Sequence, residues 1–244
     1  MIAADDSRDV IRRVFMARHG ERLDHVDREW TAKAALPCDP PLTDRGRRQA
    51  RELGIFLRKA GNVRIILSSP FARTLETAHC VAEELQLPVY VEHGASEWLN
   101  ASWFGEHRPK LVPPAQWKER LPLLDLETHQ SVVFPSYPED TKQLIARCRE
   151  TIQSIVKKYP EGDLLVVGHG ISVELMAKGL CGPDSKVKWV GYCAVCECVL
   201  EDSNGGSSME SNRDPFSAGA WRLVRNADSS FLTEPEDPRR IRYI

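Results

Sequence analysis

The chain has 244 residues, of which 42% are hydrophobic and 28% charged, and its formal net charge at pH 7 is −2. A charge this close to neutral argues against nucleic acid or an anionic membrane surface as a partner. The apolar runs stay well short of the roughly 20 residues that a membrane-spanning helix needs. Residues 1–6 carry an acidic pair where a signal peptide needs a basic end. We therefore expect a cytoplasmic protein, with the nucleus as the alternative.

Strand and helix patterns alternate along the chain, which predicts a three-layer α/β fold with a mostly parallel sheet and helices on both of its faces. The expected strands are residues 14–17, 63–67, 88–91, 163–167, 192–200 and 220–225. The expected helices are residues 44–59, 70–85, 140–159 and 172–180. The length suits a single catalytic domain over residues 1–244, with a core of about 12–225.

The segment 93–139 interrupts this alternation. It holds six prolines together with Trp98, Trp103, Phe104 and Trp117. Proline density argues against long regular elements, and the aromatic residues argue against a disordered linker. We expect an inserted cap that lies over the strand edges and helps to form a substrate pocket. An ordinary packed excursion is the alternative.

Two later segments are expected to be loosely held. Residues 203–217 are rich in Ser, Gly and Asn, which predicts a mobile hairpin loop. Residues 231–244 are charged and contain proline, which predicts a loosely attached tail.

The sequence Arg-His-Gly-Glu-Arg at 18–22 begins where the first apolar run, 14–17, ends. Open α/β sheets bind ligands beyond the carboxyl ends of their strands. The guanidiniums of Arg18 and Arg22 match phosphate oxygens, and the imidazole of His19 between them is nucleophilic in its neutral form. Positive neighbours favour that neutral form. The pattern predicts an anion site with a nucleophile inside it.

A second strand end repeats the pattern, with Gly-His-Gly at 168–170 after the apolar run 163–167. One histidine at a strand end is more often structural than catalytic, and that structural role is the alternative here. Two histidines at equivalent ends, one of them between arginines, indicate chemistry. The prediction requires His19 and His169 to meet at a single oxyanion-sized site.

Five motifs, in order along the chain, resemble the blocks of the histidine phosphatase superfamily, which includes phosphoglycerate mutase-like enzymes and acid phosphatases. They are Arg18-His19-Gly20, residues 41–46 with Gln49-Ala50, residues 69–73 with Thr77-Ala78, Glu97-Trp98, and residues 168–170. The resemblance is closest to the phosphatase domain of the ubiquitin-associated, T-cell-receptor-suppressing proteins and to the insect ecdysteroid-phosphate phosphatases. Those proteins have a similar His-Gly-Glu-Arg element and a Glu-Trp pair.

The resemblance implies a metal-independent phosphomonoester hydrolase that needs no cofactor and forms a phosphohistidine. In this scheme His19 attacks phosphorus, His169 donates to the phosphate, and Glu97 protonates the leaving oxygen. The phosphate-binding residues are Arg18, Arg22 and Arg73. Three guanidiniums supply positive charge that magnesium supplies in other phosphoryl transfers.

Several site residues have alternative interpretations. Glu21 could serve as the acid in place of Glu97, because geometry decides such roles before pKa does. Arg22 could instead pair with Asp24 or Asp27 on the surface, and Arg73 with Glu76. Ser69 could donate to phosphate. The remaining histidines match no block of the family, and packing is the simpler explanation for them: His25, His79, His93, His107 and His129.

The expected substrates are aryl or tyrosine-type phosphates, either on a phosphotyrosine protein or on a small molecule. A phosphoglycerate-type mutase is one alternative function. A catalytically weak, phosphatase-like interaction module in a protein assembly is another. Relatives often dimerise through a sheet edge, and the strand 192–200 is the candidate edge for a homodimer.

The seven cysteines are an odd number, which argues against a disulfide framework. Cys193, Cys196 and Cys198 form their one cluster. A zinc site would need a fourth ligand, so small apolar residues lining one face of a strand are the preferred interpretation.

Overall fold

The computed structural model describes residues 12–201, 215–217 and 219–236. Within these residues the strands form one sheet of seven, in the order β4-β3-β2-β5-β1-β6-β7. The first five strands in that order run parallel, and β6 and β7 are antiparallel additions at one side. The strands are β1 Arg13–Arg18, β2 Val63–Ser68, β3 Val89–Val91, β4 Leu124–Asp125, β5 Asp163–Gly168, β6 Val195–Leu200 and β7 Trp221–Asp228.

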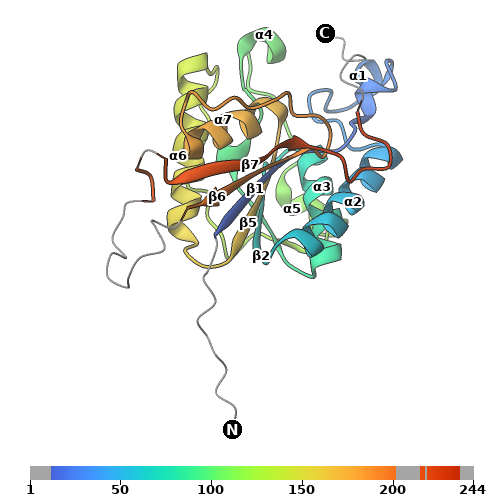
Figure 1. Ribbon diagram of the computed structural model, residues 1–244. Helices are drawn as coiled ribbons and strands as arrows, with labels where there is room; N and C mark the ends of the chain where they lie inside the picture. Colours follow the sequence, from blue (N-terminus) through green and yellow to red (C-terminus); the bar gives the residue numbers. More distant parts are fainter. Residues whose placement is uncertain (1–11, 202–214, 218, 237–244) are drawn as a thin grey trace, which may run out of the picture.

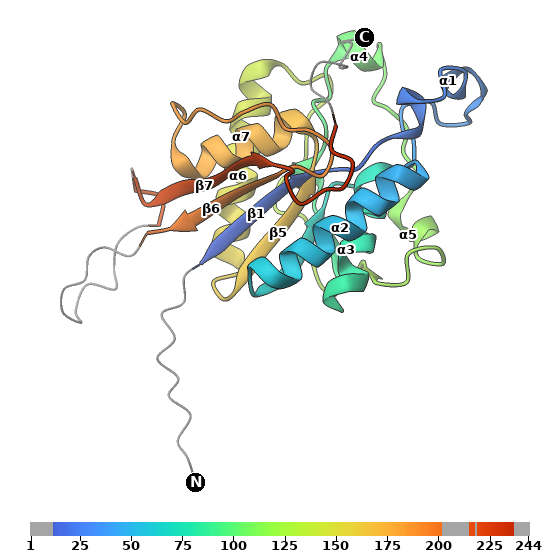
Figure 2. The ribbon, with the colours of Figure 1, turned by 45° about the vertical axis from the view of Figure 1, so that its right-hand side comes forward.

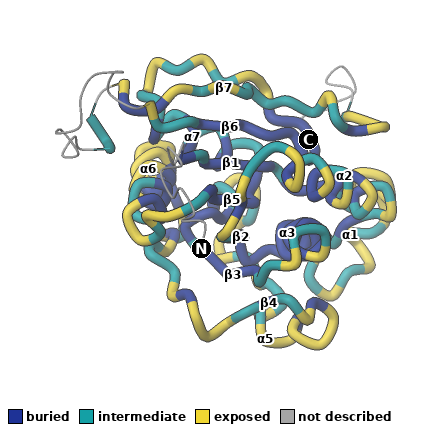
Figure 3. Tube along the Cα trace, turned by 60° about the horizontal axis from the view of Figure 1, so that its bottom comes forward, coloured by how far each residue is buried: buried dark blue, intermediate teal, exposed yellow. Residues whose placement is uncertain are grey.

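Helices cover both faces of the sheet, which confirms the expected three-layer α/β fold (Figures 1 and 3). On one face lie α2 (Asp44–Ala60) and α3 (Ala72–Leu85); on the other lie α6 (Thr141–Lys158) and α7 (Gly170–Cys181). Figure 2 separates the two pairs clearly. Successive side chains of a strand point to opposite faces, so each strand contributes to two apolar cores.

Successive residues of β1 belong to the two different cores. Phe15 packs toward α2 and α3, where Leu53 and Leu75 are fully buried. Met16 packs on the other face, against residues of α6 and α7 such as Ile152 and Met176. The central strands are therefore apolar on both sides, which explains the continuous apolar runs in the sequence.

Local signals set the helix starts. Thr43 accepts a hydrogen bond from the Gly46 N–H and caps α2, as expected. Asp140 forms a capping box with Gln143 at the start of α6. The start of α3 depends on a distant residue instead. The helix expected from residue 70 begins at Ala72, because Phe71 is extended and the Ala72 N–H donates to the Asp39 carboxylate at 2.7 Å.

The segment 93–139 consists of short pieces: η2 (His93–Ala95), α4 (Ala101–Phe104), α5 (Pro114–Trp117) and β4. Figure 1 places α4 at the end of the sheet toward which β1 points, with α1 (Trp30–Lys33) across from it. A further 3-10 turn, η1 (Leu23–His25), follows β1. The two-residue β4 pairs with β3 and was not expected from the sequence.

Two expectations for the C-terminal third are wrong. The strand 192–200 begins at Val195, because Tyr192 and Cys193 form a turn in which Cys193 has φ +50°. This strand, β6, lies between β1 and β7, so it offers no free edge for a homodimer.

The tail is also better anchored than expected. Phe231 stacks on Phe56 of α2 with ring centroids 4.4 Å apart, and Leu232 is buried. The Thr233 N–H donates to Glu52 at 3.1 Å. These contacts correct the loosely attached tail for residues 231–236, whereas 237–244, and most of the expected loop 203–217, lie outside the described residues.

Candidate active site

The two histidines leave the sheet side by side. Arg18 at the end of β1 is in register with Gly168 at the end of β5, so the residues that follow meet at one edge. The rings of His19 and His169 lie 5.4 Å apart, and the two residues are 1% and 0% exposed. The structure therefore brings together the two imidazoles that the sequence placed 150 positions apart.

Hydrogen bonding fixes the tautomer of His19. Its Nδ1 lies 2.7 Å from the carbonyl oxygen of Gly20, and a carbonyl can only accept. Nδ1 therefore carries the proton, and Nε2 keeps its lone pair. Burial lowers the pKa of His19 well below its usual range, and the charges of Arg73 and Arg18 lower it further. His19 is a neutral imidazole with a nucleophilic Nε2.

Hydrogen bonding gives His169 the opposite tautomer, with the proton on Nε2. Nη2 of Arg73 donates to its Nδ1 at 3.1 Å, so Nδ1 is an acceptor. Its Nε2–H then donates to Oγ of Ser69 at 2.9 Å. Burial lowers the pKa of His169 well below its usual range, followed by the charges of Arg73 and Arg22. Ser69 thus contacts His169 and orients it.

Arg73 is the clearest sign of an oxyanion site. It lies in the first turn of α3, is fully buried, and packs over the Phe71 ring at 4.5 Å. Its Nε and Nη1 atoms are buried and have no hydrogen-bond partner. Burial lowers its pKa to about 10, with the nearby Arg22 charge as the next cause. Buried N–H groups of a charged guanidinium without a partner call for an anionic ligand. The alternative pairing with Glu76 is wrong, since Glu76 pairs with Arg47.

Other side chains and backbone atoms of the protein fix the guanidinium groups of Arg18 and Arg22. Arg18 Nη1 donates to the Val190 carbonyl at 3.1 Å, and its guanidinium lies over the Tyr192 ring at 4.6 Å. The Nε atom of Arg18 is buried without a partner. Arg22 donates from Nε and Nη2 to the Asp24 carboxylate at 2.6 and 2.5 Å, the alternative pairing that the sequence allowed. A phosphate-binding role for Arg22 stays a prediction.

Glu97 lies beside the histidine–arginine cluster, in the loop that follows β3 and η2. Its Oε2 atom is 3.4 Å from Nδ1 of His169 and 3.5 Å from Nη2 of Arg73, and its Oε1 accepts from the Trp98 N–H. Glu21, the alternative acid, is held instead by the Thr43 hydroxyl and Arg45. Among the two carboxylates, Glu97 is the one that contacts the site.

Two residues at the site, Tyr192 and Glu236, had no role assigned from the sequence. The Tyr192 ring lies 5.8 Å from that of His19, and its hydroxyl is 2.5 Å from Nδ1 of His25. Glu236 of the tail accepts from Arg18. Tyr192 lay in an expected strand and Glu236 in an expected loose tail, so nothing in the sequence indicated that either residue belongs to the site.

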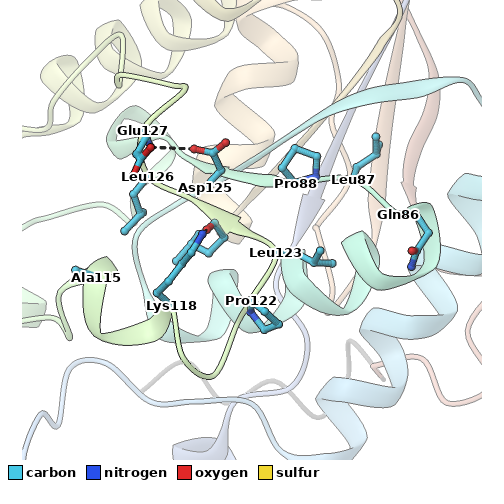
Figure 4. Close-up of a pocket in the computed structure, with 11 residues that line it drawn as sticks. Gln86, Leu87, Pro88, Ala115, Lys118, Pro122, Leu123, Asp125, Leu126 and Glu127 are labelled. Carbon is cyan, nitrogen blue, oxygen red and sulfur yellow. Dashed lines mark hydrogen bonds between the residues drawn. The ribbon is translucent and has the colours of Figure 1, made fainter.

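One open recess of the described structure lies away from the histidine–arginine cluster. A recess of about 580 Å³ adjoins β4 and is lined by residues that include Leu87, Lys118 and Leu126 (Figure 4). None of its lining residues belongs to the histidine–arginine cluster. The buried, unpartnered N–H groups of Arg73 and Arg18 are what mark the histidine–arginine cluster as a candidate active site.

Within the described part of the chain, no group of three or more His, Cys, Asp or Glu side chains is placed to hold a metal ion. Cys196 and Cys198 are buried on one face of β6, and the thiol of Cys181 donates to that of Cys198 at 3.3 Å. None of the described helices is both long and apolar enough to cross a membrane.

Fold and site together define an α/β protein with a buried arginine beside a neutral histidine, at the carboxyl ends of parallel strands. The model of the histidine phosphatase superfamily (branch 1) matches residues 14–213. The chain belongs to this superfamily, as the five motifs indicated.

Individual relatives agree with this assignment. The fold is similar to that of the ecdysone phosphate phosphatase from Bombix mori, solved in complex with tungstate, with a TM-score of 0.66 and 22% identity over 83% of this chain and 98% of that one. The uncharacterized phosphatase PhoE of Bacillus subtilis is 26% identical over 77% of this chain and 87% of its own length. The 55 kDa subunit of transcription factor tau from Saccharomyces cerevisiae is 26% identical over 93% of this chain. The chain matches 58% of that subunit's length.

Proposed function

We propose that this protein is a metal-independent phosphomonoester hydrolase that works through a phosphohistidine at His19. The observation that carries the proposal is the combination of an unprotonated His19 Nε2 with the buried, unpartnered N–H groups of Arg73. Phosphoryl transfer needs mainly a positioned nucleophile and positive charge around the equatorial oxygens. Arg18, Arg22 and Arg73 supply that charge from the protein itself.

The reaction has two halves. In the first, the Nε2 lone pair of His19 forms a bond to phosphorus, the bond to the leaving oxygen breaks, and the Glu97 carboxyl gives that oxygen its proton. In the second, the Glu97 carboxylate takes a proton from water, the water oxygen bonds to phosphorus, and the N–P bond breaks. Inorganic phosphate leaves, and both side chains return to their starting states. His169 acts by holding Arg73 in place, because its Nδ1 accepts from Nη2 of Arg73 while its Nε2–H donates to Ser69.

Turnover of p-nitrophenyl phosphate in excess EDTA tests the proposal, together with trapping of the phosphoenzyme. The phosphoryl group on the wild-type protein should be acid-labile and alkali-stable, as expected for a phosphoramidate. His19→Ala should abolish both turnover and labelling, and His107→Ala, which changes an exposed histidine outside the five motifs, should change neither. Undiminished labelling of His19→Ala would overturn the assignment.

The class of substrate that we propose is an aryl or tyrosine-type phosphate, on a phosphotyrosine protein or on a small molecule. The ring of Tyr192 lies 5.8 Å from that of His19. Trp98 follows Glu97 in the sequence, and its ring is in edge contact with the exposed Trp103 at 5.5 Å. Comparison of kcat/KM for phosphotyrosine peptides, phenyl phosphate and alkyl phosphates tests this preference.

Two other functions have some support. Similarity to a probable phosphoglycerate mutase GpmB, 25% identical over 91% of this chain, favours a mutase. A mutase would convert one phosphoglycerate into its isomer with little release of phosphate. The match to the tau subunit over 93% of this chain favours a catalytically weak interaction module. That function predicts no turnover on a broad phosphoester panel and recovery of the protein in a stoichiometric complex.

We also propose that the protein acts in the cytoplasm or the nucleus. All seven cysteines lie in the described ranges and are unpaired, as is usual in a reducing compartment. Microscopy of a fluorescent fusion, with cell fractionation, tests this location.

A further inference from the structure

Arg147 is a buried arginine that contacts the backbone of the loop carrying Glu97. It projects from α6, and its side chain is 4% exposed. Its partner Glu139 is 1% exposed and accepts from its Nε and Nη2 atoms at 2.6 and 2.8 Å. A buried ion pair gains little stability over apolar packing, so its presence calls for another explanation.

The remaining donors of Arg147 all bind the loop that carries Glu97. Nη1 donates to the carbonyl oxygens of Gly94 and Ser96 at 2.6 and 3.1 Å, and Nη2 donates to the carbonyl of Glu97 itself at 3.2 Å. A guanidinium has five N–H donors in a fixed plane. Here each donor has an acceptor, three of them on the loop backbone.

The backbone of Glu139 holds the same loop on its other side. Its N–H donates to the Leu99 carbonyl at 2.9 Å, and its carbonyl accepts from Nε1 of Trp98 at 2.9 Å. The ion pair therefore fixes residues before and after Glu97. The Glu97 side chain is not held by this pair, and its Oε2 atom reaches His169 and Arg73.

We infer that the Arg147–Glu139 pair is a positioning device for the proton-transfer carboxyl of Glu97, a role that rests on the proposed phosphatase function. Neither residue touches the phosphate site, so neither is catalytic. A general acid must lie within hydrogen-bond reach of the leaving oxygen, and small displacements reduce the rate steeply. Lysine at position 147 would keep the charge but could not reproduce the planar set of five donors.

The test uses leaving groups of different basicity. A dinitrophenolate leaves without help from an acid, whereas phenolate and alkoxides need the proton. We expect Arg147→Lys to reduce kcat/KM for phenyl phosphate roughly 30-fold, a partial loss of the roughly 100- to 10,000-fold that general acid catalysis contributes, and for 2,4-dinitrophenyl phosphate by less than about 3-fold. Glu139→Gln should shift the ratio of the two values in the same direction. A ratio measured in one preparation does not depend on the fraction of protein that is active.

A matched control is Glu197 of β6, another buried acidic residue, which pairs with Arg225 at 2.8 Å. Glu197→Gln should leave the ratio unchanged. Equal loss on both substrates in Arg147→Lys and Glu139→Gln, or failure of both variants to fold, would reduce the pair to a structural element and overturn the inference. Absence of phosphoenzyme and of turnover in the wild-type protein would instead overturn the proposed function itself, so the two failures are distinguishable.

Discussion

The carboxylate of Glu236 accepts a hydrogen bond from Nη1 of Arg18 at 3.3 Å, although 218 positions separate the two residues. The same oxygen accepts from the Tyr192 N–H at 2.9 Å. Burial raises the pKa of Glu236, while the Arg18 charge acts in the opposite direction. The C-terminal tail thus brings a negative group to an arginine of the phosphate site.

Glu236→Gln should therefore bind oxyanions more tightly. Glutamine keeps an oxygen that can accept from Arg18 and Tyr192, but it removes the charge that repels a phosphate dianion. For a partly buried pair of this kind we expect the inhibition constants of phosphate and vanadate to fall about 3-fold. Competitive inhibition of aryl phosphate turnover measures the change.

The control for this variant is Glu234→Gln, which removes an equal charge from the same tail. Glu234 is exposed and pairs with Arg45 and Arg48 on α2, away from Arg18. Weaker oxyanion binding in Glu236→Gln than in Glu234→Gln would mean that the carboxylate orients Arg18 instead of competing with the substrate.

The histidines predict how stability depends on pH. His19 and His169 have pKa values well below 6.5, and burial, followed by the charge of Arg22, lowers the pKa of His25 to about 4. Below pH 6.5 the unfolded chain takes up protons that the folded protein does not. The free energy of unfolding should therefore be highest above pH 6.5 and fall as the pH drops toward 4.

Urea unfolding at pH 7.5, 6.5 and 5.5 measures this dependence. Replacing His169 with Gln should make the loss between pH 7.5 and 5.5 smaller than in the wild type, because one neutral buried imidazole is removed. An identical loss in the variant would show that His169 is not held neutral in the folded protein.

The central strands of the fold, and the positions of His19 and His169 at their ends, follow from local sequence. The apolar runs that end at Arg18 and Gly168 are central parallel strands, buried on both faces, and periodicity detects them well. Because β1 and β5 are neighbours in the sheet, the residues after them necessarily meet. That β1 and β5 are neighbours could be inferred beforehand only from the two similar strand ends and from the resemblance of the motifs to a known family.

The remaining features depend on contacts between distant segments. β4 is two residues long and exists because it pairs with β3. The tail is ordered by Phe56, and the start of α3 by Asp39. In α6 the apolar Ile145 is half exposed, whereas the charged Arg147 two residues later is buried. A charged residue among apolar neighbours was the available signal for the pair with Glu139.

Gly20 should not tolerate a side chain. A Cβ atom at this position would lie 2.5 Å from the carbonyl oxygen of Gly46, a backbone atom that cannot rotate away. Relief requires β1 to separate from the start of α2. We expect Gly20→Ala to lower the free energy of unfolding by about 3 kcal/mol, at the upper end for overpacking.

Gly170 is the matched position after the other histidine. The nearest atoms to a Cβ there are 3.7 Å away, which is ordinary van der Waals contact, so Gly170→Ala should change the free energy of unfolding by less than about 1 kcal/mol. Urea unfolding of the two variants side by side measures the difference. Because the Gly20 carbonyl also fixes the proton on Nδ1 of His19, Gly20→Ala should lose phosphoenzyme formation under conditions where it is still folded. Equal stability of the two alanine variants would show that the chain relaxes around Gly20, and full labelling of Gly20→Ala would show that His19 does not depend on that carbonyl.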